Sequence, residues 1–261
     1  MDRAAVPAEL VTFAAELADA DGAVLARYFR SGVASQAKSD ESPVTVADRE
    51  AETVVRTMIE ARYPDHGISG EEFGTVRGDA EWLWLIDPLD GTKSFLKGKP
   101  TFGALIGLAH RGRHVLGVID QPFLRERWIG ADGHGTRWNG RPVTCRPCAG
   151  LGEASMAAVG VDAATLADEP RVAPLRRAVR HLQFGLECYA YGLLAGGHLD
   201  LAIDGELGVD DIAALEPVVR NAGGVLTDLE GRTVDATYAG RIIAAGSPAL
   251  HRAAIDLMAG G

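Results

Sequence analysis

The sequence predicts a layered protein of the mixed α+β or α/β class, and three observations support this. Two helix-like segments come first, at residues 8–30 and 45–62. Strand-like segments within residues 67–131 follow, which favours a mainly antiparallel sheet with the two helices packed on it. Beyond residue 150, strand-like and helix-like segments alternate, as expected for an α/β layer.

The two N-terminal helices are predicted from the spacing of their apolar residues. Apolar side chains recur every three or four positions in both segments, which places them on one face of a helix. We expect Gly22 to weaken or bend the first helix, because glycine has a low helix propensity. Thr45 is a suitable N-cap for the second helix, and Tyr63-Pro64 marks its end.

The remaining elements follow in order along the chain. Strands of the first sheet are expected at residues 67–72, 82–87, 102–109, 114–120 and 126–131. The second half is expected to contain strands at 154–160, 199–204, 224–228 and 241–245, and helices at 173–182, 187–197, 211–222 and 248–259. The pattern changes near residue 146, so we divide the chain into residues 1–146, with the helix pair and the mainly antiparallel sheet, and 147–261, with the α/β layer and Asp211.

The composition narrows the classes of partner. The chain has 36 acidic and 26 basic residues and a formal net charge of −10, which argues against a nucleic-acid surface or binding to anionic membranes. No apolar run approaches the ~20 residues of a membrane span. The N-terminus carries an early acid and no secretory pattern, so a cytoplasmic location is expected.

The three cysteines do not indicate a disulfide framework. Cys145 and Cys148 have the spacing of a zinc half-site or a redox pair. A structural zinc site needs two further ligands, and the remaining cysteine, Cys188, is distant. A redox pair would open a helix after a strand, whereas this pair lies in a loop that contains proline and glycine. Two incidental thiols are therefore the favoured interpretation.

The most informative stretch is Asp87-Pro88-Leu89-Asp90-Gly91-Thr92, at the end of an apolar strand. Pro88 cannot donate a ladder hydrogen bond, so we expect the strand to end there. Gly91 lets the backbone approach a ligand closely, and the free N–H groups after it favour an anion. Carboxylates beside anion-binding amides make chemical sense if a cation lies between them. An acidic turn explains Asp90-Gly91 alone, but it does not explain Asp87.

Further acids stand at the ends of predicted elements. Glu71 follows a strand, Asp211 opens a helix, and Asp48 lies in the first turn of another helix. Taken alone, Asp211 and Asp48 are also explained as first-turn helix acids. Together with Asp87 and Asp90 they offer the hard oxygen ligands that Mg²⁺ prefers, and no cluster of histidine and cysteine suggests zinc. The sequence therefore predicts a site for a divalent cation and a phosphate.

These residues resemble the motifs of the inositol monophosphatase-like family of metal-dependent, lithium-sensitive phosphatases. Three motifs match in order: Gly70-Glu71-Glu72, the block from Trp84 to Phe95, and Asp211-Ile212-Ala213-Ala214 followed by Ala222-Gly223-Gly224. The resemblance covers essentially the whole chain. It implies the α-β-α-β-α sandwich of the inositol monophosphatase and fructose-1,6-bisphosphatase type, a homodimer, and hydrolysis of a small phosphate monoester.

The resemblance also implies a ligand set for the metal. One Mg²⁺ ion would be held by Glu71, Asp87 and the backbone carbonyl of Leu89, and a second by Asp87, Asp90 and Asp211. A third, weaker ion would join through Glu71, and Mn²⁺ is an expected substitute.

The same resemblance implies the residues that handle water and phosphate. Thr92, oriented by Asp48, would position the attacking water together with Glu71. The amides of Gly91 and Thr92 would receive the phosphate. Lys38 would lie on a mobile loop over the site.

Within the family, the chain resembles the histidinol-phosphate phosphatase branch in three segments: Val118–Pro122, Arg125–Trp128 and Cys188–Ala195. That branch would hydrolyse L-histidinol phosphate to L-histidinol in histidine biosynthesis. The aromatic residues Trp128 and Tyr191 in these segments are also explained by packing alone.

The expected substrate pocket departs from that branch. The branch usually has Gly-Gly-Asp where this chain has Gly185-Leu186-Glu187, and Glu where this chain has Asp204. We expect Glu187 and Asp204 to face the ammonium group of the substrate, with their lengths exchanged between the two walls. Leu186 would narrow or dry the pocket.

Three alternatives stay open at this point. An inositol-1-phosphate or broad sugar-phosphate phosphatase would use the same metals without an ammonium contact. An aspartyl-phosphate enzyme is disfavoured, because its motif separates the two aspartates by one residue, whereas Pro88-Leu89 separates them here. A regulatory or RNA-associated module on a phosphatase fold would show a degenerate metal set or a basic face, and neither is evident.

Overall fold

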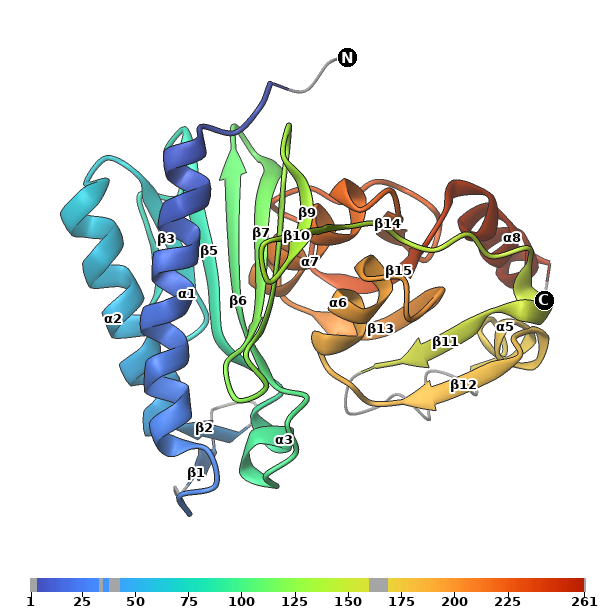
Figure 1. The fold of residues 1–261 in the computed structure, drawn as a ribbon, viewed down its shortest axis with the longest axis horizontal. Helices are drawn as coiled ribbons and strands as arrows, with labels where there is room; N and C mark the ends of the chain where they lie inside the picture. The colour runs from blue at the N-terminus through green and yellow to red at the C-terminus, as the bar shows by residue number, and fades with distance from the viewer. Residues whose placement is uncertain (1–3, 33–34, 38–42, 160–168, 261) are drawn as a thin grey trace.

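The computed structural model describes residues 4–32, 35–37, 43–159 and 169–260. Two helices, an eight-stranded sheet, a central helix layer, a five-stranded sheet and a last helix layer follow one another across the molecule (Figure 1). The predicted α-β-α-β-α fold class is confirmed.

The first layer contains α1 (Ala8–Tyr28) and α2 (Val46–Arg62). Thr45 caps α2 as predicted, since its hydroxyl accepts a hydrogen bond from the N–H of Ala47 at 3.0 Å. The weak point expected at Gly22 is not seen, because α1 continues through it as one helix. A Cβ at Gly22 would lie 2.9 Å from the Cβ of Pro122, so glycine is needed there for the close contact between α1 and the sheet.

The large sheet is antiparallel except for one parallel pair, β3 with β5. Its spatial order is β10-β9-β8-β7-β6-β5-β3-β4. The strands are β3 (Gly67–Gly70), β4 (Gly74–Val76), β5 (Trp82–Asp90), β6 (Gly103–His110), β7 (Arg113–Gln121), β8 (Glu126–Ala131), β9 (Gly135–Trp138) and β10 (Arg141–Val143). The sequence did not predict the short strands β4, β9 and β10, nor the separate hairpin of β1 (Ser35–Ala37) and β2 (Pro43–Thr45).

The prediction that the strand ends at Pro88 is wrong. Strand β5 runs on to Asp90, but its register against β6 shifts between Asp87 and Asp90. Pro88 has no N–H to donate, and the N–H of Leu89 donates to Oδ1 of Asp87 at 2.9 Å instead of to the ladder. The irregularity therefore interrupts the pairing without ending the strand, and it carries the two aspartates.

The central layer contains α6 (Tyr189–Ala195) and α7 (Val209–Asn221). Helix α7 lies very close to the large sheet because glycines Gly107, Gly117 and Gly130 stand side by side on β6, β7 and β8. A Cβ on Gly117 would lie 2.0 Å from the carbonyl oxygen of Ala214, so a larger residue would push α7 away. This row of glycines brings the first turn of α7, with Asp211, down to the sheet.

The second sheet has the order β12-β11-β13-β15-β14. Its strands are β11 (Ser155–Ala158), β12 (His181–Phe184), β13 (Leu201–Leu207), β14 (Val225–Asp228) and β15 (Gly240–Ala245). The last layer contains α5 (Ala173–Ala178) and α8 (Pro248–Ala259). The predicted helix 173–182 is too long, because Val179 is extended and β12 pairs in parallel with β11. The division at residue 146 stays a prediction.

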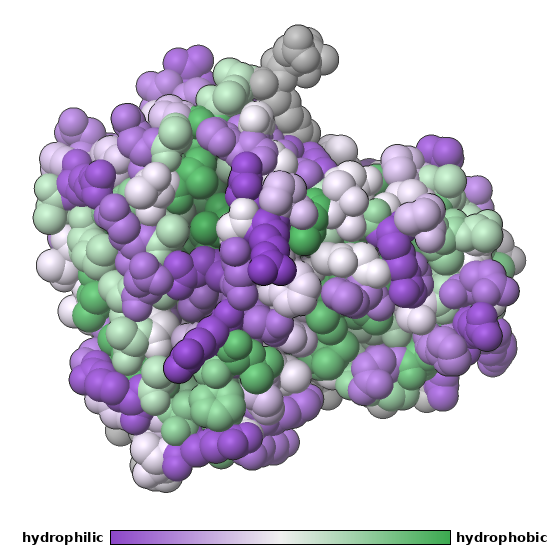
Figure 2. Space-filling model, in the orientation of Figure 1, coloured by the Kyte–Doolittle hydropathy of each residue, from purple (hydrophilic) through white to green (hydrophobic). Residues whose placement is uncertain are grey.

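Hydrophilic residues cover much of the face in Figure 2, and hydrophobic residues appear there as separate patches. Within the described part of the chain, no helix combines the length and the apolar character needed to cross a membrane. The core itself is built mainly of the aliphatic and aromatic side chains of the two sheets and of the helices that pack on them.

Candidate active site

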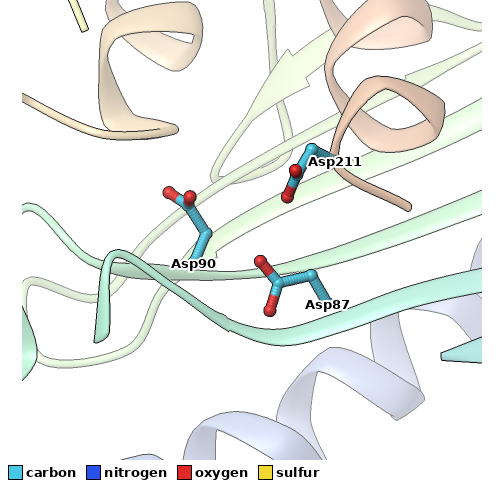
Figure 3. Close-up of side chains that lie close together, drawn as sticks. All are labelled: Asp87, Asp90 and Asp211. Atoms are coloured by element: carbon cyan, nitrogen blue, oxygen red, sulfur yellow. The ribbon is translucent and has the colours of Figure 1, made fainter. Parts of the chain in front are cut away.

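Three aspartates from two layers meet at the irregular end of β5. Asp87 and Asp90 project from β5, and Asp211 projects from the first turn of α7 (Figure 3). Carboxylate oxygens of the three side chains lie within 4.8 Å of one another, a spacing that suits one or more metal ions. The structure thus brings together three of the predicted metal ligands, of which Asp87 and Asp211 are 124 residues apart in the sequence.

These aspartates line a cavity of about 340 Å³. Most of the predicted site residues line the same cavity: Glu71, Asp87, Leu89, Asp90, Gly91, Thr92, Glu187, Asp204 and Asp211. A larger cavity of about 630 Å³ lies between α1 and strands β7–β9, but it contains none of the predicted site residues. The chemistry of the lining therefore assigns the smaller, acidic cavity as the candidate active site.

The carboxylates of the cavity raise one another's pKa. Burial, and then the carboxylate of Glu71, hold the pKa of Asp87 well above its usual value. Burial and the carboxylate of Asp90 likewise raise the pKa of Asp211. The main charges acting on these two groups are other acids, so the cluster holds negative charge that a divalent cation would neutralise. Hard carboxylate oxygens are the ligand type that Mg²⁺ prefers.

Thr92 connects the cavity to α2. It is the first residue of the short helix α3 (Thr92–Leu96), and Gly91 before it has a positive φ of 79°. The Thr92 hydroxyl has two acceptors within reach for its one hydrogen, the carbonyl oxygen of Leu89 at 3.2 Å and Oδ1 of Asp48 at 3.4 Å. Asp48 is fully buried, and its other oxygen accepts the N–H of Thr45 at 2.9 Å. The capping acid of α2 is thereby aimed at the hydroxyl of Thr92.

Glu187 and Asp204 also line the cavity. Oε1 of Glu187 accepts a hydrogen bond from the hydroxyl of Ser94 at 2.7 Å. The N–H of Gly205 donates to Oδ1 of Asp204 at 2.9 Å, and the hydroxyl of Tyr191 is 3.4 Å from Oδ2. Burial, and then the charge of Asp90, raise the pKa of Asp204 well above its usual value. Both acids therefore face the same space as the metal-ligand candidates.

Other predicted residues lie elsewhere. Gly185 and Leu186 precede Glu187 but are not among the residues that line the acidic cavity, and Leu186 packs against the core around Trp128. Lys38 lies outside the described residues. Cys145 and Cys148 are free thiols, and their interpretation as incidental stays a prediction.

Glu52, which the sequence did not indicate, is a buried acid that supports the turn after β3. Its carboxylate accepts the N–H of Glu72 at 2.7 Å and of Phe73 at 3.2 Å, and it pairs with Arg56 at 2.6 Å. It therefore holds the turn that carries Glu71. The available signal was its position four residues after Asp48 on the buried face of α2.

Asp210 and Ser94 are two further site residues that the sequence did not indicate. Asp210 lines the cavity next to Asp211, and burial together with the Asp211 carboxylate raises its pKa to about 7. Ser94 is buried two residues after Thr92 and holds Glu187. The sequence shows Asp210 beside a predicted ligand, but nothing local connects Ser94 to a residue 93 positions away.

Comparison with known proteins identifies the family. Residues 7–259 match the inositol monophosphatase family. The chain belongs to this family. Because its relatives are phosphatases that hydrolyse phosphate monoesters, the protein is a phosphoric monoester hydrolase. The family is metal-dependent, and the cluster of Asp87, Asp90 and Asp211 is suited to hold metal.

Several relatives are similar over most of the chain. The bifunctional phosphatase IMPL2 of Arabidopsis thaliana is 40% identical over 95% of this chain and 75% of its own length. The histidinol-phosphatase of Chlorobaculum parvum is 36% identical over 84% of this chain and 85% of its own. The structure of an inositol monophosphatase from Zymomonas mobilis has a TM-score of 0.86 and 37% identity, covering 96% of this chain and 98% of that one.

Proposed function

We propose that this phosphatase hydrolyses L-histidinol phosphate to L-histidinol and phosphate, with Mg²⁺ as its metal. The observation that carries the proposal is the position of Glu187 and Asp204 in the same cavity as the aspartate cluster. A substrate that carries a phosphate ester and an ammonium group on neighbouring carbons has a partner for each charge there. The similarity to histidinol-phosphatases, at 36% identity for the Chlorobaculum protein, supports the proposal.

The metal ligands are proposed as two overlapping sets. Glu71, Asp87 and the carbonyl of Leu89 would hold one Mg²⁺ ion, and Asp87, Asp90 and Asp211 a second, with a third, weaker ion through Glu71. Asp210, which lines the same cavity, adds negative charge beside the second set. When bound, such ions lower the pKa of water and stabilise charge on the phosphate oxygens. Mn²⁺ is expected to substitute.

Thr92, Asp48 and Glu71 would prepare the water that attacks the phosphorus atom. The hydroxyl of Thr92 lies within reach of Asp48, a buried acceptor, so it is oriented with its lone pairs available to a water molecule. Glu71 would accept the proton of that water as a general base. Thr92→Ala should therefore lower kcat much more than it changes KM.

The phosphate would be received by backbone N–H groups at Gly91 and Thr92. Thr92 begins α3, so its N–H has no acceptor within the helix, and both Gly91 and Thr92 line the cavity. Glu187, which packs over Gly91, and Asp204 would accept the ammonium group of the substrate. Tyr191, held in the core, would keep Asp204 facing the cavity.

An inositol-1-phosphate or broad sugar-phosphate activity is the second candidate, because the family includes such phosphatases. A polyol has no ammonium group to neutralise Glu187 and Asp204, and leaving two acids without a cation disfavours its binding. A purely regulatory module is disfavoured, because the chain retains all of the acids proposed as metal ligands. The homodimer, the sensitivity to Li⁺ and the cytoplasmic location stay predictions.

A substrate panel tests the proposal. We would measure kcat/KM for histidinol phosphate, inositol 1-phosphate and AMP in saturating Mg²⁺ and again after chelation. Preference for histidinol phosphate and loss of activity on chelation are expected. Equal or greater kcat/KM for inositol 1-phosphate would contradict the proposed substrate, and undiminished activity after chelation would contradict the metal.

A further inference from the structure

The segment before α6 has an unusual backbone. Three consecutive residues have positive φ angles: Gly185 at 82°, Leu186 at 86° and Glu187 at 48°. Glycine adopts such angles freely, but leucine and glutamate do so rarely and at an energetic cost. Other contacts must therefore hold this segment in place.

Those contacts come partly from the metal-binding end of β5. The N–H of Cys188 donates to Oδ2 of Asp90 at 2.7 Å. The hydroxyl of Ser94 donates to Oε1 of Glu187 at 2.7 Å. A third bond, from the N–H of Gly185 to the carbonyl of Ala158 at 2.9 Å, ties the segment to the second sheet. Glu187 is thus attached to the same short stretch that carries Asp90 and Thr92.

The side chain of Glu187 lies directly over Gly91. A Cβ at Gly91 would be 2.7 Å from Cγ of Glu187. With its stem packed on Gly91 and Oε1 bound to Ser94, the glutamate has little rotational freedom. Among the described residues, no hydrogen bond or ion pair engages Oε2, which leaves this oxygen for a ligand in the cavity.

We propose that Ser94 is a positioning residue that sets substrate specificity through Glu187. Its hydroxyl fixes the glutamate in one rotamer, so that Oε2 is ready to accept the primary ammonium group of the substrate. This inference rests on the proposed function. Ser94 is not among the residues that line the acidic cavity, and it is buried at the third position of α3 with its hydroxyl bound to Glu187.

Loss of the Ser94 hydroxyl should affect a substrate with an ammonium group and leave one without it unaffected. Without the hydroxyl, Glu187 is free to rotate, and a cationic substrate must order it on binding. A substrate without an ammonium group does not use Glu187 and loses nothing. The loss of one hydrogen bond should raise KM for histidinol phosphate roughly three- to tenfold, with kcat and the hydrolysis of inositol 1-phosphate nearly unchanged.

The experiment compares four variants with the wild type on these two substrates in saturating Mg²⁺. Ser94→Ala removes the hydroxyl, Ser94→Thr keeps it, Glu187→Gln removes the charge, and the fourth variant combines Ser94→Ala with Glu187→Gln. We expect Ser94→Ala to lower the preference for histidinol phosphate, Ser94→Thr to restore it, and the double variant to be no worse than Glu187→Gln alone. Ser247→Ala is the matched control, because it removes a hydroxyl that caps α8 away from the cavity.

The outcomes separate this inference from the proposed function. If the wild type shows no preference for histidinol phosphate, the substrate proposal is overturned and this inference with it. If Glu187→Gln lowers the preference but Ser94→Ala does not, this inference alone is overturned. Equal losses for both substrates in Ser94→Ala would assign Ser94 a purely structural role in α3. Should Ser94→Ala fold poorly, Ser94→Cys, of similar size but a weaker donor, must show the same selective effect in milder form.

Discussion

Asp87 and Asp200 are both almost fully buried aspartates, with exposed fractions of 5% and 1%, but they have opposite surroundings. Asp200 accepts hydrogen bonds from Arg146 at 2.7 and 2.5 Å and from the N–H of Ser155 at 2.8 Å. Burial alone would raise the pKa of Asp200, but these bonds hold it below the usual value. Asp87 has other carboxylates around it, and its pKa is raised.

Asp228 resembles Asp200, because it is a buried aspartate whose carboxylate is bound by hydrogen-bond donors. The carboxylate of Asp228 accepts Nε of Arg232 at 2.6 Å and the N–H groups of Glu230 and Arg232 at 2.9 and 2.8 Å. Burial opposes these bonds, but they lower the pKa of Asp228. Away from the cavity, the fold thus supplies these acids with donors. In the cavity, acids outnumber the basic lining residue Lys93, and the main charges acting on Asp87 and Asp211 are other acids.

Asp87→Asn should have the largest effect on activity. Mutation of a residue that only supports a metal ligand typically lowers metal affinity or activity ~10–100-fold. Loss of a ligand that is proposed to bridge two ions should therefore lower kcat/KM by more than ~100-fold. The metal-free variant should be at least as stable as the wild type, because one repelling buried charge is gone. Steady-state kinetics and thermal unfolding with and without Mg²⁺ check both. A variant that keeps its activity would contradict the proposed ligand set.

Asp200→Asn should have the reverse profile. It removes the charge that binds Arg146 and should lower the free energy of unfolding by about 2 kcal/mol, because hydrogen bonds to charged groups contribute on that scale. Activity per folded molecule should stay near that of the wild type, since Asp200 lies outside the acidic cavity. Urea unfolding gives the free energy. Unchanged stability together with lost activity would invalidate the distinction between the two kinds of acid.

The metal-free protein should lose stability as the pH rises. Asp87 and Asp211 have a raised pKa in the folded state, whereas an unfolded aspartate titrates near ~3.9. The folded state therefore binds more protons between these values, and this contribution to stability is full below ~3.9 and is lost as the pH rises through the folded pKa. Saturating Mg²⁺ should reduce this loss of stability with rising pH. The test is the unfolding temperature from pH 5 to 8, measured with and without Mg²⁺. An equal pH dependence in both series would count against a cation site.

Arg232→Ala should have the smallest effect. Arg232 is 72% exposed, and ion pairs at exposed positions contribute less than ~1 kcal/mol. The backbone N–H groups of Glu230 and Arg232 would still hold Asp228. Urea unfolding should show a change within ~1 kcal/mol and no change in activity. If the free energy of unfolding fell as much as in Asp200→Asn, the exposure of Arg232 would not explain a difference between the ion pairs Arg232–Asp228 and Arg146–Asp200.

The sequence by itself determined the features that depend on neighbouring residues. The apolar spacing predicted α1 and α2, and the capping chemistry of Thr45 and Asp48 placed the start of α2 correctly. The order of acids, glycine and threonine from Asp87 to Thr92 identified the type of site, because carboxylates and free amides have the same chemistry in any fold. The motifs also identified the family, which the match over residues 7–259 confirmed.

The tertiary structure alone decided how distant segments meet. Asp211 reaches Asp87 because the glycines of β6, β7 and β8 let α7 lie against the sheet, and each glycine acts on a residue far along the chain. Strand β5 continues past Pro88 because its partner β6 accommodates the shift in register, which a local rule for proline does not include. The contacts of Ser94 with Glu187 and of Glu52 with Glu72 likewise join residues with no local relation. Such contacts depend on the packing of whole layers, and local propensity carries no information about which layer a side chain will face.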